Sequence, residues 1–305
     1  MTTHIKALLA SMLVLAACSG NPFVTDGTDP GTDPGGPITV DTPVTVPAAV
    51  KVNMNSAKLA DYTTGADSIT LNLTSQDATA LEATYLRAPQ FDVTGYDAYS
   101  YQETSSNRYV VALVREVGSA KAVIAVDAGQ FANYHGGGSF TRADVFTMPT
   151  AGVGEPFTYS GTYVGLLNIG ERVPGPGGDL DPERAFRTEG RALITADFTE
   201  MSISGGVDGR RIVDGDPLGN GGALGTIALF ETGINANGTF AGRVYVGTDE
   251  EFIDAGAYAG LFAGTNATEI ATLMVFNPVP SDNLLFEHGM VVLPSCASGG
   301  GPGCP

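Results

Sequence analysis

The residue with the best-defined chemistry is Cys18, the last residue of the segment Leu15-Ala16-Ala17-Cys18. An apolar run from Ala7 to Leu15 leads into it, and this run is well short of the ~20 residues that a membrane-spanning helix needs. The pattern is that of a bacterial lipobox, where small residues let a signal peptidase cut before a cysteine that carries diacylglycerol. We therefore expect residues 1–17 to be a signal peptide and Cys18 to carry lipid. The alternative is a chance cysteine at the end of an ordinary secretory peptide.

The segment after the cysteine has the composition of a tether. Ser19 stands where an acidic residue commonly retains lipoproteins on the inner membrane, so the sequence favours an outer-membrane location. Residues 18–47 contain a near repeat from Thr25 to Gly36 that is rich in Pro, Gly and Asp. Such a segment cannot bury enough apolar area to offset the chain entropy lost on ordering. We predict a disordered tether that holds the folded part away from the membrane.

The other two cysteines, Cys296 and Cys304, lie in a Gly/Pro/Ser-rich tail at residues 295–305. An exported chain meets an oxidising compartment, so we predict a disulfide that closes a small loop. A metal site is the alternative, although no histidine accompanies the pair.

Residues for catalysis are few. After the signal peptide the chain has only two histidines, His135 and His288, which are far apart and fall in different predicted domains. No Gly-x-Ser-x-Gly or His-Glu-x-x-His motif is present. His288 shares the alternation of Leu284, Phe286, Met290 and Val292, which favours a histidine of a strand wall. We predict no enzyme, although a catalytic triad assembled from distant residues stays an alternative because such sites are defined by geometry.

Acidic clusters are the remaining candidates for chemistry. The segment from Asp214 to Asn220 spaces oxygen ligands as a calcium loop does, but it lacks the closing glutamate of an EF-hand, and a solvated hairpin loop is the better interpretation. The segment Asp249-Glu250-Glu251, together with Asp254, is interpreted as an exposed turn, and a docking patch for a basic partner is the second interpretation. The sequence thus predicts no metal and no cofactor, with calcium at the first loop left open.

The net charge narrows the list of partners. The chain has 33 acidic and 15 basic residues and a formal charge of −18. A surface of this sign repels nucleic acid and anionic lipid headgroups. We therefore expect no nucleic-acid partner, and we expect contact with the membrane through the N-terminal lipid alone.

Residues 48–150 are predicted to form a small β-rich domain. Four segments have the composition of strands: Ser68 to Leu73, Tyr96 to Gln102, Arg108 to Glu116, and Lys121 to Val126. The continuously apolar run from Tyr109 to Val114 indicates a strand covered on both faces. The stretch from Ala128 to Met148 shows no clean period and is predicted to be a loop with a final strand.

Residues 151–294 show a more regular pattern of eight strands joined mostly by short turns. The predicted strands are Phe157 to Gly165, Arg191 to Phe198, Met201 to Ser204, Ala223 to Glu231, Thr239 to Gly247, Gly256 to Gly264, Thr268 to Phe276 and Leu284 to Leu293. Period-two alternation over so many short segments favours an all-β, antiparallel, up-and-down eight-stranded barrel. A sandwich with the same strand count is the alternative, because periodicity does not show which strands pair first and last.

A series of motifs in the barrel region resembles a known family. In order these are Tyr159-Ser160-Gly161-Thr162-Tyr163, then Ala196-Asp197-Phe198, then Gly238-Thr239-Phe240-Ala241-Gly242, then the run from Tyr258 to Glu269. The series is similar to the C-terminal barrel of the transferrin-binding protein B family, which includes surface lipoproteins and factor H-binding relatives. The resemblance covers about residues 155–293. One such barrel is present here, where the full transferrin receptor component has two lobes.

The residues of these motifs are expected to serve packing. Gly260 and Gly264 share a face with Tyr258 and Phe262, and would leave room for aromatic rings or permit the bend of a small barrel. Glu269 is expected to be a structural hydrogen-bonding partner.

The resemblance implies an outer-membrane, surface-exposed lipoprotein that captures a protein or iron-source ligand without catalysis. Loops at the barrel mouth and the preceding domain would carry the contact. An envelope lipoprotein without a soluble ligand is the alternative, and an enzyme comes third.

Overall fold

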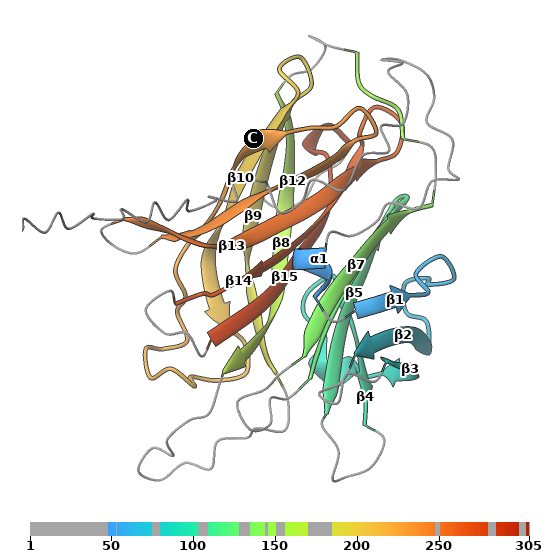
Figure 1. The fold of residues 1–305 in the computed structure, drawn as a ribbon, viewed down its shortest axis with the longest axis vertical. Coiled ribbons are helices and arrows are strands. Elements are labelled where there is room, and N and C mark those ends of the chain that lie inside the picture. The colour runs from blue at the N-terminus through green and yellow to red at the C-terminus, as the bar shows by residue number, and fades with distance from the viewer. Residues whose placement is uncertain are drawn as a thin grey trace, which may run out of the picture.

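The computed structural model describes residues 48–52, 54–74, 80–102, 109–127, 135–143, 146–150, 156–169, 185–247, 251–279, 285–298 and 303–304. Its elements are nearly all strands, arranged in two antiparallel sheets (Figure 1). The predicted signal peptide, Cys18 and the predicted tether lie outside the described residues. Within the ranges above, no helix has both the length and the apolar character needed to cross a bilayer.

The first sheet has seven strands, each paired with the next along the chain. They are β1 (Met54–Ala57), β2 (Ser68–Thr74), β3 (Ala80–Arg87), β4 (Asp97–Tyr101), β5 (Val110–Val117), β6 (Ala120–Asp127) and β7 (Gly136–Arg142). The helix α1 (Ala48–Lys51) precedes them, and the short helix η1 (Pro89–Phe91) joins β3 to β4. The strand predictions for β2, β4, β5 and β6 are confirmed.

The sequence analysis missed β1 and β3. Strand β1 is four residues long and buries only its first side chain, so it shows no alternation. Strand β3 has the sequence ALEATYLR, which is rich in helix-favouring Ala, Leu and Glu. Pairing with β2 from Ala80 to Leu86 overrides that preference.

Both faces of β5 are covered, as its apolar run predicts. Val111 and Leu113 belong to the apolar cluster that continues into the second sheet. Ala112 and Val114 belong to a separate cluster on the other face of the first sheet. The first sheet is therefore a layer between two cores.

The second sheet closes on itself as a barrel of eight antiparallel strands. They are β8 (Phe157–Ile169), β9 (Phe186–Asp197), β10 (Ser202–Ile212), β11 (Ile227–Gly233), β12 (Thr239–Gly247), β13 (Phe252–Ala263), β14 (Glu269–Phe276) and β15 (Leu285–Pro294). Strand β15 returns to pair with β8, so the predicted barrel is confirmed and the sandwich alternative is wrong.

Strand β10 is much longer than the predicted Met201 to Ser204. It continues to Ile212 through three glycines, a shift of register between Asp208 and Arg211, and charged residues. A bulge and charged side chains hide a strand from a search for apolar alternation. One of those charged side chains, Arg210, points into the barrel and is 3% exposed.

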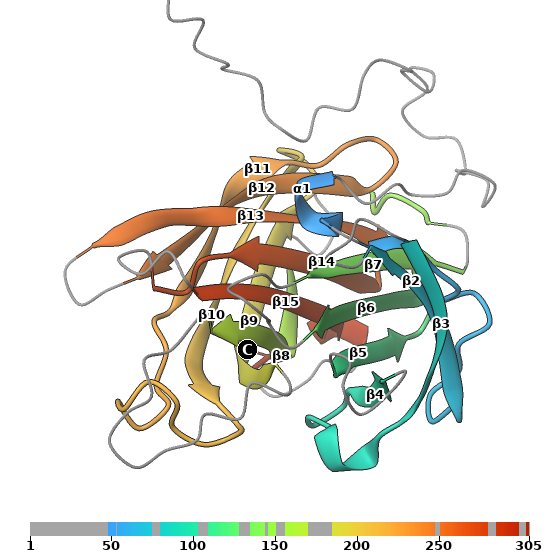
Figure 2. The same cartoon turned by 60° about the horizontal axis from the view of Figure 1, so that its bottom comes forward.

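Strand β7 begins with Gly136-Gly137-Gly138, which lie in the stretch predicted to be mostly loop. A Cβ atom on Gly137 would collide with the carbonyl of Lys51 and the backbone nitrogen of Met54. Glycine is therefore required for β7 to approach β1 and α1. Figure 2 shows α1 near β7, β13 and β14, with β5, β6 and β7 close to β14 and β15.

The barrel interior is filled by side chains. The ring of Phe240 packs against the rings of Tyr258 and Phe262, with centroid distances of 6.2 Å and 5.2 Å. A Cβ on Gly260 would meet the Phe240 ring, which confirms that this glycine makes room for an aromatic side chain. Gly264 differs, because its φ of +74° places it at a turn.

Candidate functional site between the sheet and the barrel

The two sheets share one continuous apolar interface, which we call the junction. It is formed by β5, β6 and β7 on one side and by the outer wall of β8, β13, β14 and β15 on the other. Ala122, Ile124 and Phe140 face Leu166, Leu273 and Met290 across it within one buried cluster. Burial of this kind on both sides fixes the first sheet against the barrel wall.

Tyr96 crosses the junction and reaches into the barrel wall. Its hydroxyl donates a hydrogen bond to the carbonyl of Thr162 in β8 (2.7 Å) and accepts one from the backbone N–H of Val292 in β15 (3.3 Å). The continuous β15–β8 pairing ends at Met290 and Val164, and Val292 and Thr162 follow in the same register. The tyrosine hydroxyl thus stands where a direct strand-to-strand hydrogen bond would lie. Burial raises the pKa of Tyr96, so the hydroxyl keeps the proton that it donates.

Polar contacts at the rim also tie the two sheets together. Ser119, in the β5–β6 turn, donates to Glu269 Oε2 at the start of β14 (3.2 Å). Arg142 at the end of β7 donates to the carbonyl of Phe262 in β13 (2.9 Å). The prediction that Glu269 acts as a structural hydrogen-bonding partner is confirmed.

His288 is a buried histidine of the barrel wall, as predicted, and it faces the junction. It is 2% exposed, and its ring lies against Gly136 of β7. Neither ring nitrogen makes a well-formed hydrogen bond within the part of the chain that the structure describes. Burial lowers the pKa of His288 to about 4, so the ring is neutral in the folded protein at pH 7.

The two histidines were predicted to lie in separate domains, yet their segments meet. Gly136, which directly follows His135, contacts the ring of His288. The backbone N–H of His135 donates to Asp127 Oδ1 (2.6 Å). This contact positions the start of β7 at the junction.

A buried ion pair lies inside the barrel. Arg210 Nη2 in β10 donates to Glu287 Oε2 in β15 at 2.5 Å, and both side chains are fully buried. The hydroxyls of Tyr163 and Thr188 each donate to Glu287 Oε1 at 2.6 Å. Burial and the neighbouring Glu287 carboxylate raise the pKa of Tyr163, so its hydroxyl stays a donor. Arg210, Tyr163 and Thr188 together satisfy both oxygens of the Glu287 carboxylate, so the cluster ties β8, β9 and β10 to β15.

Two glycines provide the space for this cluster. Gly165 in β8 and Gly289 in β15 are directly paired. A Cβ on Gly165 would collide with the Glu287 carboxylate and the Thr188 hydroxyl, and a Cβ on Gly289 would collide with the Tyr163 ring. The ion pair therefore dictates residue type at neighbouring positions of the wall.

The acidic loop from Asp214 to Asn220 uses its carboxylates within the protein. Asp214 accepts from the backbone N–H of Arg187 (2.7 Å) and pairs with its guanidinium (2.5 Å). Asp216 accepts from the backbone N–H groups of Gly221 and Asn220, which lower its pKa. No group of three or more metal-ligating side chains occurs in the described ranges.

The second acidic segment falls partly outside the described residues. Positions 248–250, including Asp249 and Glu250, are among those the structure does not describe. Asp254 forms an ion pair with Arg243 of the neighbouring strand β12, and both side chains are partly exposed. The docking patch for a basic partner stays a prediction.

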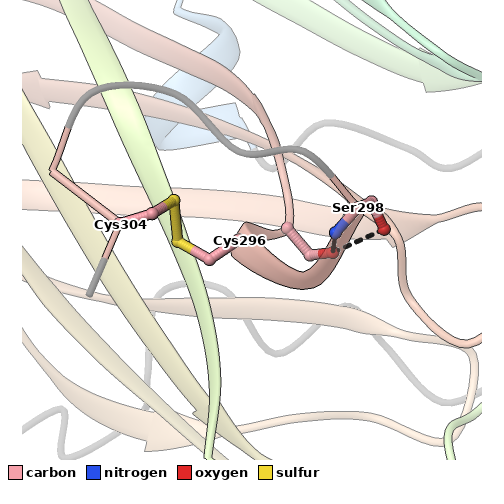
Figure 3. Close-up of a disulfide and its surroundings, with 4 residues drawn as sticks. Cys296, Ser298 and Cys304 are labelled. Atoms are coloured by element: carbon pink, nitrogen blue, oxygen red, sulfur yellow. Dashed lines mark hydrogen bonds between the residues drawn. A yellow bond between two sulfur atoms is a disulfide. The ribbon is translucent and has the colours of Figure 1, made fainter.

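The tail contains the disulfide predicted between Cys296 and Cys304. It closes a loop after the short helix η2 (Cys296–Ser298), in which Ser298 Oγ and Ser295 Oγ are hydrogen-bonded (Figure 3). The loop lies against β8, where Gly303 approaches the hydroxyl of Ser160. The disulfide therefore holds the end of the chain on the barrel wall.

A hollow of about 450 Å³ opens in the first sheet beside the junction. It lies at the turn that leads into β4 and at the end of β5. Its lining includes Tyr62, Thr94, Tyr96, Asp97 and Arg115. The sequence analysis did not identify these residues as a group, because they come from separate turns and strand ends.

The architecture defines an all-β protein in which a seven-stranded sheet packs on a closed eight-stranded barrel. No protein-family model and no curated protein matches the chain. It is similar to solved structures of transferrin binding protein B and of a surface lipoprotein. A transferrin binding protein B double mutant from Haemophilus parasuis Hp5 aligns over 77% of this chain and 52% of its own, with 12% identity and a TM-score of 0.37.

Two further solved structures are similar. Transferrin binding protein B of serogroup B Neisseria meningitidis aligns over 77% of this chain and 51% of its own, with 15% identity and a TM-score of 0.32. A structure described as a surface lipoprotein aligns over 73% of this chain and 95% of its own, with 14% identity and a TM-score of 0.33. This chain spans about half the length of these two transferrin binding proteins.

Loss of the charge on Glu287 should destabilise the barrel strongly. Glu287→Gln leaves Arg210 buried without a counter-ion, and we expect the free energy of unfolding to fall by about 3–5 kcal/mol, measured by urea denaturation. Asp208→Asn removes a carboxylate from an exposed pair with Arg191 and should cost no more than about 1 kcal/mol. The double variant Arg210→Met, Glu287→Leu should cost less than Glu287→Gln. Equal, small effects of Glu287→Gln and Asp208→Asn would show that the buried pair is not needed.

His288 should make the folded state sensitive to mild acid. Its pKa in the folded protein, about 4, lies below its ordinary value of 6.5, so protonation favours the unfolded chain. Above pH 6.5 the ring is neutral in both the folded and the unfolded chain, and the free energy of unfolding is not affected. As the pH drops from 6.5 towards 4, the unfolded chain binds a proton that the folded chain does not, and the free energy of unfolding falls by about 3 kcal/mol in total. His288→Leu should therefore lose less stability than the parent between pH 7.5 and pH 4.5 in urea denaturation. The same loss in both proteins would contradict the assignment.

Proposed function

We propose that this chain is a lipid-anchored lipoprotein of the outer membrane, exposed at the cell surface, which captures a protein or nutrient ligand without catalysis. The observation that carries the proposal is the arrangement of the chain. A lipobox ending at Cys18 is followed by a Pro/Gly/Asp-rich segment, and then by a seven-stranded sheet packed on a closed barrel. A tether of that composition gives a rigid domain reach above the membrane to which its lipid is bound.

An exposed aromatic patch on the barrel supports capture over a purely structural role. Phe230 in β11 is 61% exposed and Phe252 in β13 is 56% exposed. Tyr245 in β12 lies between these strands and packs its ring against Phe230, with centroids 5.3 Å apart. The part of β13 that is buried at the junction runs from Ala257 to Ala263, so Phe252 at the start of β13 and Phe230 in β11 lie outside the wall that the first sheet covers. Clustered aromatic side chains left in water are a common feature of surfaces that bind other proteins.

The contacts of the buried and acidic polar side chains also support binding over catalysis. Glu287 and Arg210 neutralise each other inside the barrel, and His288 is held neutral at the junction. Asp214 and Asp216 are bound by groups of their own loop and strand. Each of these side chains has a structural task, so binding by surface groups is the better-supported activity.

The anchor is tested by Cys18→Ala. The parent should incorporate a radioactive fatty acid and sediment with the membrane fraction, and the variant should be unlabelled and soluble, because the thiol is the attachment point. Protease treatment of intact cells should degrade the parent if it faces outward. A variant that stays attached to the membrane would overturn the lipoprotein assignment.

Capture is tested on intact cells incubated with growth medium, with bound proteins identified after washing. The parent should retain a ligand, and Phe230→Ala with Phe252→Ala should reduce retention at least tenfold, the loss expected for two aromatic anchors. Leu86→Ala is the matched control, because Leu86 is 63% exposed but lies on β3 of the first sheet. Failure of the parent to retain any ligand, under iron-limited or iron-replete conditions, would favour the structural alternative.

A further inference from the structure

Arg115 is a cation without a carboxylate partner. Most described arginines form ion pairs, among them Arg87 with Asp92 and Arg243 with Asp254. Arg142, the other described arginine without a carboxylate partner, donates to a backbone carbonyl instead. None of the ion pairs among the described residues involves the Arg115 guanidinium. In a chain with more than twice as many acidic as basic residues, such a site is unexpected.

The guanidinium of Arg115 is held in place at the hollow. Its Cζ lies 4.8 Å from the centroid of the Tyr96 ring, in a cation–π contact. Gly95, with a φ of +80°, lies beside the group, where a Cβ atom would stand 3.5 Å from the guanidinium carbon. Tyr96 is itself fixed, because its hydroxyl bridges two barrel strands. The charge is therefore oriented before any ligand arrives, which lowers the entropic cost of binding.

The carboxylates of the hollow are already compensated. Asp97 accepts from the Tyr62 hydroxyl (2.7 Å), from the backbone N–H of Gly65 (2.6 Å) and from Arg87 (3.1 Å). Asp92 pairs with Arg87 in the same way. Glu116 pairs with Lys121 (3.2 Å), whose ammonium also donates to the carbonyl of Tyr62. Arg115, which contacts Tyr96, thus provides the charge in the hollow that lacks an oppositely charged partner.

These compensated carboxylates still have acceptor capacity, since each can accept about four hydrogen bonds. Thr64 and Thr94 add exposed hydroxyls to the lining. The lining therefore offers one guanidinium without a carboxylate partner beside several acceptors and hydroxyls. It suits a ligand with one carboxylate and adjacent hydrogen-bond donors, and it disfavours a ligand with two negative charges.

We propose that the hollow at Arg115 is a binding site for a small α-amino carboxylate, either a free amino acid or the C-terminal residue of a peptide. The guanidinium binds the carboxylate through its paired N–H donors, and the ammonium or amide donors of the ligand face Asp92, Asp97 and Glu116. The volume of the hollow is in the range of known small-ligand sites. This inference does not depend on the lipid anchor or on capture by the aromatic patch.

The test is a titration of the purified, full-length mature chain with L-serine, with the tripeptide Gly-Gly-Ser and with L-serinamide. Binding is followed by calorimetry and by the NMR resonance of the Arg115 Nε–H group. L-serine or the tripeptide should shift that resonance saturably, and L-serinamide, which lacks the carboxylate, should not. Saturation by L-serine alone identifies free amino acids as the source, and tighter binding of the tripeptide identifies peptide C-termini. Succinate should bind at least tenfold more weakly than L-serine.

Variants separate binding from structure. Arg115→Gln should weaken L-serine binding at least tenfold. Arg115→Lys should weaken it about threefold to tenfold, because lysine keeps the charge but lacks the paired N–H donors of the guanidinium. Arg191→Gln, a change at an exposed ion pair on the barrel, should leave the affinity unchanged. Circular dichroism verifies that each variant is folded. No saturable shift with either ligand, or an unchanged affinity in folded Arg115→Gln, would overturn the proposal.

Discussion

The buried ion pair between Arg210 and Glu287 is the constraint on which the barrel depends. Two charges inside a protein are expensive unless each is neutralised and hydrogen-bonded, and here the Tyr163 and Thr188 hydroxyls complete the carboxylate shell. The pair joins β10 to β15, strands on different parts of the wall. It fixes which residues face inward on both strands, since a one-residue slip would expose the charges to apolar surroundings. The glycine pair that accommodates the cluster follows from the same requirement.

The junction places a second constraint on the same wall. The outward face of β13–β15 and β8 is apolar because the first sheet covers it, while the inward face holds the barrel core. This accounts for the nearly continuous burial of β14 and β15, which are strands with a core on each side. It also accounts for His288, a polar residue kept neutral where two cores meet. The aromatic patch lies beyond the edge of this covered wall.

Much of this architecture is present in the sequence as periodicity. Eight alternating segments predicted the barrel, and the apolar run from Tyr109 to Val114 predicted a strand between two cores. Strand β10 was predicted too short because Arg210 and a bulge interrupt its pattern, although alternation in β15 already placed Glu287 on the face opposite His288. An inward glutamate requires a buried cation, and that signal was available. The Arg115 hollow gave no such signal, because its lining is assembled from separate turns by tertiary packing.

The position of the Tyr96 hydroxyl has a consequence for the order of folding. It joins residues 196 positions apart along the chain, and β15 cannot form its complete set of contacts with β8 until the segment that leads into β4 has docked. Contacts of such long sequence separation are slow to form, because loop closure must precede them. Pairing of β15 with β8 is therefore coupled to assembly of the first sheet. An isolated β8–β15 fragment would lack the two hydrogen bonds that the Tyr96 hydroxyl makes to these strands. The two sheets are expected to fold and unfold as one cooperative unit.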